Sequence, residues 1–281
     1  MKKVSVFIPT IGREELILLA IKSVLKQTYK NIELIISDAG SPNPVTTILK
    51  KNKIFDERIK IIRNSLKLRI RDNYLIGLNN CKGDYVMCLC DDDYIDEDYI
   101  DKCVSSMSKK IDAAIGIQKT IGLKESRIFQ NNNKNKYSIN NYLFSYLWLI
   151  KSTYMKIYTL MPMMYKREKL LKNFSFPNFN NGNFADNYIF IKYNANKVAI
   201  TNSYYYYRVY PESGGLKVSV NDLILAGEKY FEIIRKIKKD ILFILILRLK
   251  ISYEIMTRNI RYYKIFSLEM IFRILFLKGI K

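Results

Sequence analysis

The sequence predicts an α/β fold in which helices cover both faces of a mostly parallel β-sheet. Over the first hundred residues, short apolar runs rich in β-branched residues alternate with segments whose apolar residues recur at helical spacing. The apolar runs show no regular polar alternation, which is typical of parallel strands buried on both faces. The predicted strands are residues 4–8, 32–36, 59–62 and 85–90, and the predicted helices are residues 14–27, 45–51 and 69–80.

Local residues justify the boundaries of these elements. Pro9 stops the first strand, because proline has no N–H to donate to a neighbouring strand. Glu14 and Glu15 suit the first turn of the next helix, where the helix dipole favours acidic side chains. The turn sequence Asp-Ala-Gly-Ser-Pro at 38–42 ends the second strand. Later in the chain, residues 113–118 and 197–201 predict strands and residues 188–193 predict a helix.

The composition indicates a folded protein with an excess of positive charge. The 281 residues carry a formal net charge of +21, which favours anionic partners. Lys, Ile and Asn are all abundant, so we ascribe part of this charge to compositional bias and expect no nucleic-acid partner. Four cysteines without a C-x-x-C pair, and the absence of histidine, argue against a zinc site and for buried, reduced thiols.

No segment has the length or hydrophobicity expected of a membrane span. The longest uninterrupted apolar run, residues 241–247, is far shorter than the about 18 residues that a transmembrane helix needs. The apolar stretch at the amino terminus is also too short for a signal peptide. We therefore expect a cytoplasmic protein that can also lie on the inner face of the cell membrane.

Three consecutive carboxylates, Asp91, Asp92 and Asp93, follow the apolar strand 85–90. Adjacent carboxylates repel one another, and a divalent cation would neutralise them through the oxygen ligands that hard cations prefer. Taken alone, the cluster is explained more simply as a solvated acidic loop or a helix cap. Loops 10–13 and 38–41 also follow predicted strands, and the carboxyl ends of parallel strands meet at one edge, where ligands bind. The three loops together predict a nucleotide site.

Three segments of the chain match a known pattern in the same order: residues 4–10 (VSVFIPT), 20–41 (AIKSVLKQTYKNIELIISDAGS) and 82–93 (KGDYVMCLCDDD). They resemble the bacterial family 2 glycosyltransferases, and the resemblance covers residues 3–215. It implies a single, Rossmann-like glycosyltransferase-A domain at 1–215, with a nucleotide-sugar-binding half (1–110) and an acceptor half (111–215). Residues 216–281 would then form a basic amphipathic helical extension, which either packs on the catalytic domain or adsorbs to an anionic membrane.

The resemblance also implies roles for residues that contact the donor. Pro9 and Thr10 would border the nucleotide base, Asp38 would hydrogen-bond a uracil ring, and Asp91 would reach the ribose. Ala39 departs from the pattern, which usually has a second acid at this position. Three arginines are the other candidates for contact with the nucleotide sugar: Arg13, Arg71 and Arg208. Arg71 could instead be an exposed cap, because it lies at the start of a predicted helix.

The remaining implied roles are those of metal ligand and catalytic base. A divalent metal, Mn²⁺ or Mg²⁺, would be held by Asp92 or Asp93. Cys90 stands where the family often has its first acid, and this leaves the choice between the two open. Asp186 matches the catalytic base, with Ala185 in place of the preceding acid. A helix cap is the alternative role for Asp186.

The resemblance predicts an inverting, metal-assisted hexosyltransferase. The donor would be a nucleoside-diphosphate sugar, and we expect the nucleotide to be UDP. The acceptor would be a hydroxyl of a surface polysaccharide or lipid-linked glycan. Two alternatives remain at this point. A metal-dependent nucleotidyltransferase would also use carboxylates beside a nucleotide crevice, and a non-enzymatic basic module that binds nucleic acid or membrane would also explain the charge.

Overall fold

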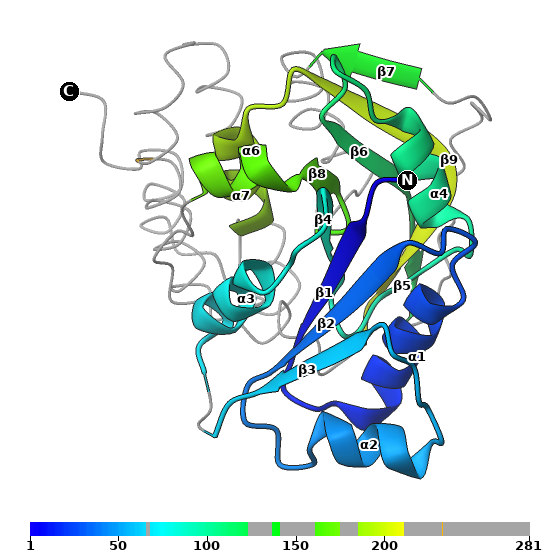
Figure 1. Cartoon of the computed structure of the whole chain (residues 1–281), viewed down its shortest axis with the longest axis vertical. Coiled ribbons are helices and arrows are strands. Elements are labelled where there is room, and N and C mark those ends of the chain that lie inside the picture. The colour runs from blue at the N-terminus through cyan, green and yellow to red at the C-terminus, as the bar shows by residue number, and fades with distance from the viewer. Residues whose placement is uncertain (66–67, 123–136, 141–160, 175–184, 211–231, 233–281) are drawn as a thin grey trace, which may run out of the picture.

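The computed structural model describes residues 1–65, 68–122, 137–140, 161–174, 185–210 and 232 (Figure 1). Its strands are β1 (Val4–Thr10), β2 (Ile32–Asp38), β3 (Ile59–Arg63), β4 (Tyr85–Cys88), β5 (Tyr94–Ile95), β6 (Ala113–Ile121), β7 (Tyr137–Asn140), β8 (Met164–Lys166) and β9 (Lys197–Arg208). Its helices are α1 (Glu14–Leu25), α2 (Val45–Lys51), α3 (Ile70–Asn79), α4 (Tyr99–Ser106), α6 (Arg167–Asn173) and α7 (Ala185–Tyr193).

The strands form one mixed sheet in the order β3-β2-β1-β4-β8-β6-β9-β5, with β7 paired to β9. The first four strands in this order are parallel, as the apolar runs predict. In the second half, β6 and β9 also pair in parallel, whereas β8 runs antiparallel to both β4 and β6, and β5 and β7 run antiparallel to β9, so this half of the sheet is mixed. Short antiparallel strands depend on distant partners, which leave no local pattern in the sequence.

The register of the parallel strands aligns three polar side chains at one edge of the sheet. Thr10 at the end of β1 lies opposite Asp38 at the end of β2, and Asp38 lies opposite Arg63 at the end of β3. Asn73 of α3 ties this edge together, since its side-chain amide donates to the Thr10 carbonyl (3.2 Å) and accepts from the Ser37 hydroxyl (2.6 Å). Both strand ends and the helix are thereby fixed at the edge where a ligand would bind.

Helices lie on both sides of the parallel strands (Figure 1). α3 packs on β1 through an edge-to-face contact of the Tyr74 and Phe7 rings, whose centroids are 4.8 Å apart. Gly77 makes this close approach possible, because a Cβ atom at this position would lie only 2.6 Å from the Phe7 ring. α1 and α2 lie on the other side of the strands, next to each other (Figure 1).

The later strands differ in length from the sequence-based expectation. Strand 113–118 extends to Ile121 in β6, and strand 197–201 extends to Arg208 in β9. The tyrosine-rich segment 204–207 therefore lies within β9, where Tyr206 is paired with Tyr94 of β5. This pairing brings the end of β9 to the loop that carries the three adjacent aspartates.

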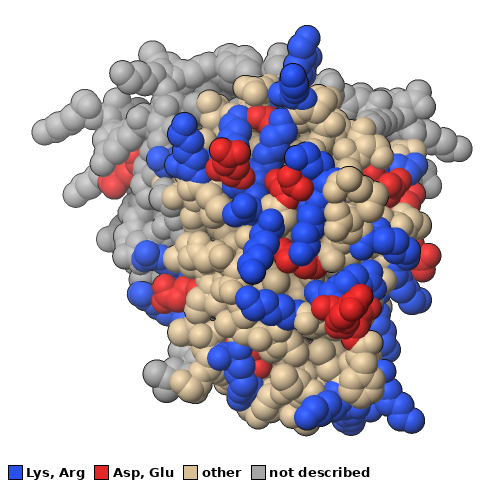
Figure 2. Space-filling view, in the orientation of Figure 1, with Lys and Arg blue, Asp and Glu red and all other residues tan. Residues whose placement is uncertain are grey.

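The predicted division at residue 215 stays a prediction, because the proposed extension, apart from residue 232, lies outside the described residues. Within the described part of the chain, no helix combines the length and the hydrophobicity needed to cross a bilayer. On the face shown in Figure 2, Lys and Arg side chains are spread over the surface with acidic side chains among them, and they do not gather in one patch.

Candidate functional site

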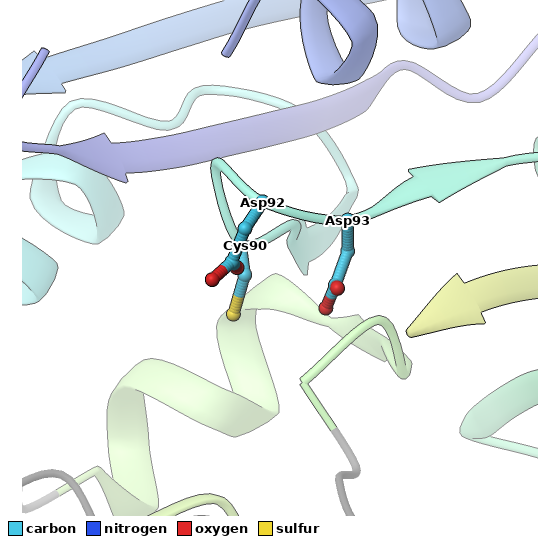
Figure 3. A group of neighbouring side chains, drawn as sticks. All are labelled: Cys90, Asp92 and Asp93. Atoms are coloured by element: carbon cyan, nitrogen blue, oxygen red, sulfur yellow. The ribbon is translucent and has the colours of Figure 1, made fainter. Parts of the chain in front are cut away.

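The candidate site is built around loop 90–93, which joins β4 to β5 at the carboxyl edge of the parallel strands; we call it the carboxylate loop. The side chains of Cys90, Asp92 and Asp93 project from the same side of this loop (Figure 3). Their potential ligand atoms all lie within 4.8 Å of one another. The Asp91 side chain is turned toward β1 and α1 instead, where it meets Thr10 and Arg13.

Asp91 is almost fully buried and is held by two residues of loop 10–13. The Thr10 hydroxyl donates to its Oδ2 atom (2.6 Å). The Arg13 guanidinium contacts both oxygens, through Nε at 3.3 Å to Oδ2 and through Nη2 to Oδ1. Burial raises the pKa of Asp91, while Arg13 opposes this shift by favouring the charged form. The structure thus confirms that loops 10–13 and 90–93 meet, as the strand ends predict.

Asp92 joins the same network from the other side of Arg13. Its Oδ2 atom lies 3.1 Å from Arg13 Nη1 and accepts a hydrogen bond from the Tyr210 hydroxyl at 2.9 Å. Arg13 Nη1 also donates to the Tyr210 hydroxyl oxygen. Burial and the negative charge of Asp92 raise the pKa of Tyr210, so this phenol stays protonated. Tyr210 is not among the residues that the sequence predicts for the site, because only the end of β9 brings it to the carboxylate loop.

Asp93 is buried and accepts a hydrogen bond from the backbone N–H of Arg208 at 3.0 Å. Its pKa is raised well above the ordinary value, first by burial and then by the charge of Asp92. The Arg208 guanidinium is directed to backbone carbonyls instead. It donates to the carbonyl oxygen of Asp92 and, at 2.9 Å, to that of Leu16. In this arrangement Arg208 ties the carboxylate loop to α1, and its predicted contact with a diphosphate stays a prediction.

These residues fit a hard divalent cation. Asp92 and Asp93 are adjacent carboxylates, and the burial of Asp93 beside Asp92 disfavours two unneutralised charges. Carboxylate oxygens are the ligands that Mg²⁺ and Mn²⁺ prefer, whereas the Cys90 thiol suits softer metals. The prediction that Asp92 or Asp93 holds the metal therefore stands on the chemistry of the donor set, and the geometry does not choose between them.

Asp38 is completely buried and has a role that the sequence did not predict. Its Oδ1 atom accepts hydrogen bonds from the backbone N–H and the hydroxyl of Ser41, with the first at 2.9 Å. Its Oδ2 atom accepts from Arg63 Nη1 at 2.8 Å and from the Val45 N–H at 3.3 Å. Asp38 thus holds the turn at 38–45, and the implied contact with a uracil ring stays a prediction that would require these donors to move.

The structure gives the positions of three other predicted site residues, whose roles stay predictions. Pro9 lies in β1 opposite Ser37 of β2. Arg71 lies in the first turn of α3, and its buried Nε atom has no hydrogen-bond partner among the described residues. Asp186 is the second residue of α7, and its side chain lies outside the described part of the chain. The proximity of Asp186 to the carboxylate loop therefore stays a prediction.

Most of the site lies in the part of the chain that matches a known protein family. Residues 5–174 match the sequence model of the family described as Glycosyl transferase family 2. This match covers more than half of the chain, and it includes loops 10–13 and 38–41 and the carboxylate loop. Most residues of the site therefore lie within the segment that matches the family.

The chain is also similar to shorter stretches of curated bacterial proteins. It is 36% identical over 94 residues to the GalNAc(5)-diNAcBac-PP-undecaprenol beta-1,3-glucosyltransferase of Campylobacter jejuni, over 33% of this chain and 30% of that protein. It is 37% identical over 94 residues to the UDP-Glc:alpha-D-GlcNAc-diphosphoundecaprenol beta-1,3-glucosyltransferase WfaP of Escherichia coli, over 34% of this chain and 37% of that protein. The similarity thus spans less than two-fifths of the length of either relative.

Two known structures resemble the whole chain. The crystal structure of S. aureus TarS 1–349 in complex with UDP-GlcNAc matches with a TM-score of 0.69 at 17% identity, over 97% of this chain and 79% of that one. The mannosyltransferase PcManGT from Pyrobaculum calidifontis, in complex with GDP-Man and Mn²⁺, matches with a TM-score of 0.62 at 15% identity, over 96% and 77%. These matches confirm the predicted glycosyltransferase-A fold.

Proposed function

Because this chain belongs to glycosyl transferase family 2, we propose that it moves a hexose from a UDP-linked sugar to a hydroxyl of a surface-polysaccharide or lipid-linked glycan. The family already makes it a glycosyltransferase that uses a nucleotide sugar, and the proposal adds the donor, the acceptor and the mechanism. The observation that carries the proposal is the carboxylate loop, which lies at the carboxyl ends of parallel strands beside loop 10–13.

The choice of donor and acceptor is supported by the similar proteins. TarS was crystallised with UDP-GlcNAc, and the name of WfaP specifies UDP-Glc as its donor. The names of both glucosyltransferases place their acceptors on an undecaprenol diphosphate. We infer that the present protein acts on a lipid-linked glycan at the inner face of the membrane, which would suit its net charge of +21.

The proposed mechanism gives each residue of the site one task. A divalent cation held by Asp92 and Asp93 would act as a Lewis acid that neutralises charge on the leaving diphosphate. Asp186, in the first turn of α7, would accept the proton of the acceptor hydroxyl as general base. A base on the side of the sugar opposite the leaving group gives a single displacement, so the anomeric configuration inverts.

The test is a panel of nucleotide sugars incubated with the full chain and Mn²⁺, followed by measurement of released nucleoside diphosphate. We expect release from one UDP-sugar, loss of release with a chelator, and a decrease of at least about a hundredfold in Asp92→Asn. Asp84→Asn is the matched control. Asp84 is the residue before β4, at the end of this strand opposite the carboxylate loop, and it forms an exposed ion pair with Lys2 (2.7 Å).

The outcomes separate the proposal from its alternatives. No release of nucleoside diphosphate from any nucleotide sugar, together with release of pyrophosphate from a nucleoside triphosphate in the presence of a sugar phosphate, would show a nucleotidyltransferase. Failure of every nucleotide sugar to bind or react, with no effect of metal, would refute the proposed function. In Asp186→Asn we expect normal binding of UDP and loss of transfer, because the base acts on the acceptor and not on the donor. Weak UDP binding in this variant would contradict that role.

A further inference from the structure

Arg13 connects the two carboxylates at the centre of the site. Its guanidinium contacts both oxygens of Asp91 and lies 3.1 Å from Oδ2 of Asp92. It also donates to the Tyr210 hydroxyl, which in turn donates to the same oxygen of Asp92. Arg13 is thus the side-chain cation that neutralises this part of the carboxylate loop in the described structure.

The Arg13 side chain is partly exposed to solvent. About 30% of the side chain is exposed, whereas 5% of the Asp91 side chain is exposed. Arg13 is the residue before α1, and it follows Gly12, whose φ of +75° lies in the left-handed region. The Arg13 side chain is therefore accessible from solvent, while the carboxylate that it holds is buried.

Asp92 is the residue for which Arg13 and a metal would compete. The proposed function assigns Asp92 to a divalent cation, and the structure shows Arg13 paired with this carboxylate. A guanidinium 3.1 Å from the carboxylate would repel a second cation bound there, because like charges at this separation interact strongly in a partly buried site. A guanidinium released from Asp92 would in turn be well suited to bidentate contact with a phosphate.

Resting on the proposed function, we propose that Arg13 holds Asp92 in the metal-free enzyme and exchanges this carboxylate for the donor diphosphate when a divalent cation binds. The exchange makes the cation and the nucleotide bind cooperatively, since each favours the same position of Arg13. Binding linkage requires that the two ligands strengthen each other by the same factor. Arg13 is in this sense a positioning residue that couples the two ligands.

The test is a titration of the full chain with Mn²⁺, in which free Mn²⁺ is measured by EPR with and without UDP. Without UDP, we expect Arg13→Met to bind Mn²⁺ at least about fivefold more tightly than the unaltered protein, because the competing cation is gone. With Mn²⁺ present, we expect the same variant to bind UDP at least about fivefold more weakly. A residue that only maintained the shape of the site would weaken both ligands.

Two further variants make the test independent of folding and of general charge. Arg13→Lys keeps a positive charge beside Asp91 but cannot span both carboxylates, so we expect a folded protein with tighter Mn²⁺ binding in the absence of UDP. Lys22→Met removes one positive charge from the last turn of α1, the helix that Arg13 precedes, and should leave Mn²⁺ binding unchanged. An equal effect of Lys22→Met would show that only long-range charge is involved and would overturn the proposal.

The remaining outcomes separate this inference from the proposed function. If the unaltered protein binds Mn²⁺ and UDP, but Arg13→Met and Arg13→Lys bind Mn²⁺ equally or less tightly, the exchange is wrong and the proposed function stands. If the unaltered protein binds neither Mn²⁺ nor UDP, the proposed function fails, and the exchange fails with it.

Discussion

Asp38 distinguishes two accounts of how this enzyme holds its nucleotide. The family resemblance implies that its carboxylate binds a uracil ring, whereas the structure gives both oxygens to donors of the protein. Asp38→Asn tests the two accounts, because asparagine has nearly the same shape but only one acceptor oxygen. If the carboxylate organises the turn at 38–45, the substitution will mainly lower the free energy of unfolding.

The size of the effect follows from the four hydrogen bonds of Asp38. The amide can accept the bonds of one oxygen, so the donors of the other oxygen face an NH₂ group. A hydrogen bond to a charged group contributes about 1.5–3 kcal/mol, so two losses cost up to about 6 kcal/mol. The hydrogen bond from Val45 N–H to Asp38 is long, at 3.3 Å, and the Arg63 side chain is 39% exposed, so each of these two hydrogen bonds contributes less than a short, buried one. We expect a loss of about 2–4 kcal/mol.

Urea denaturation of Asp38→Asn, Arg63→Met and the double variant measures this loss and the coupling between the two residues. Asp72→Asn is the control, since Asp72 forms an ion pair with Arg69 on the surface of α3. In the folded Asp38→Asn protein, the Kd for UDP should change by less than about threefold, which is under 1 kcal/mol. A stability change below about 0.5 kcal/mol together with a tenfold loss of UDP affinity would refute our reasoning.

Two further predictions concern the core and the opposite edge of the sheet. Gly77→Ala should cost about 1–3 kcal/mol in urea denaturation, because its Cβ would lie 2.6 Å from the Phe7 ring; a neutral effect would contradict this. Burial alone would raise the pKa of Glu33, but hydrogen bonds from Lys3 and Ser5 lower it below the ordinary 4.5. This stabilisation is present above pH 4.5 and lost as the pH falls through the folded-state pKa. Glu33→Gln should therefore be less stable than the unaltered protein at pH 7, and the difference in denaturation midpoint should shrink at pH 3.

The arrangement of the parallel strands and their loops could be predicted because it depends on local patterns. Apolar runs locate β1 to β4, and parallel strands necessarily place loops 10–13, 38–41 and 90–93 at one edge. The contacts of Thr10 and Arg13 with Asp91 are an outcome of this arrangement. The family match over residues 5–174 covers the same strands and loops.

The partners within the site could not be predicted, because they depend on register and on long-range pairing. Arg63 reaches Asp38 only because β2 and β3 pair with these residues opposite each other. Tyr210 reaches Asp92 because β9 continues past the predicted end at residue 201 and pairs with the two-residue strand β5. A single sequence shows neither the exact register of the parallel strands β2 and β3 nor the antiparallel pairing of β5 with β9, whose residues are more than a hundred positions apart.

The buried amide of Asn73 has a consequence for the thermodynamics of binding. It joins β1, β2 and α3 by hydrogen bonds to Thr10 and Ser37, so the floor of the predicted nucleotide site is assembled before any ligand arrives. Ordering a loop on binding costs conformational entropy that reduces affinity. A floor fixed in this way avoids that cost, and the entropy change on binding should come mainly from the donor itself and from exposed side chains above it.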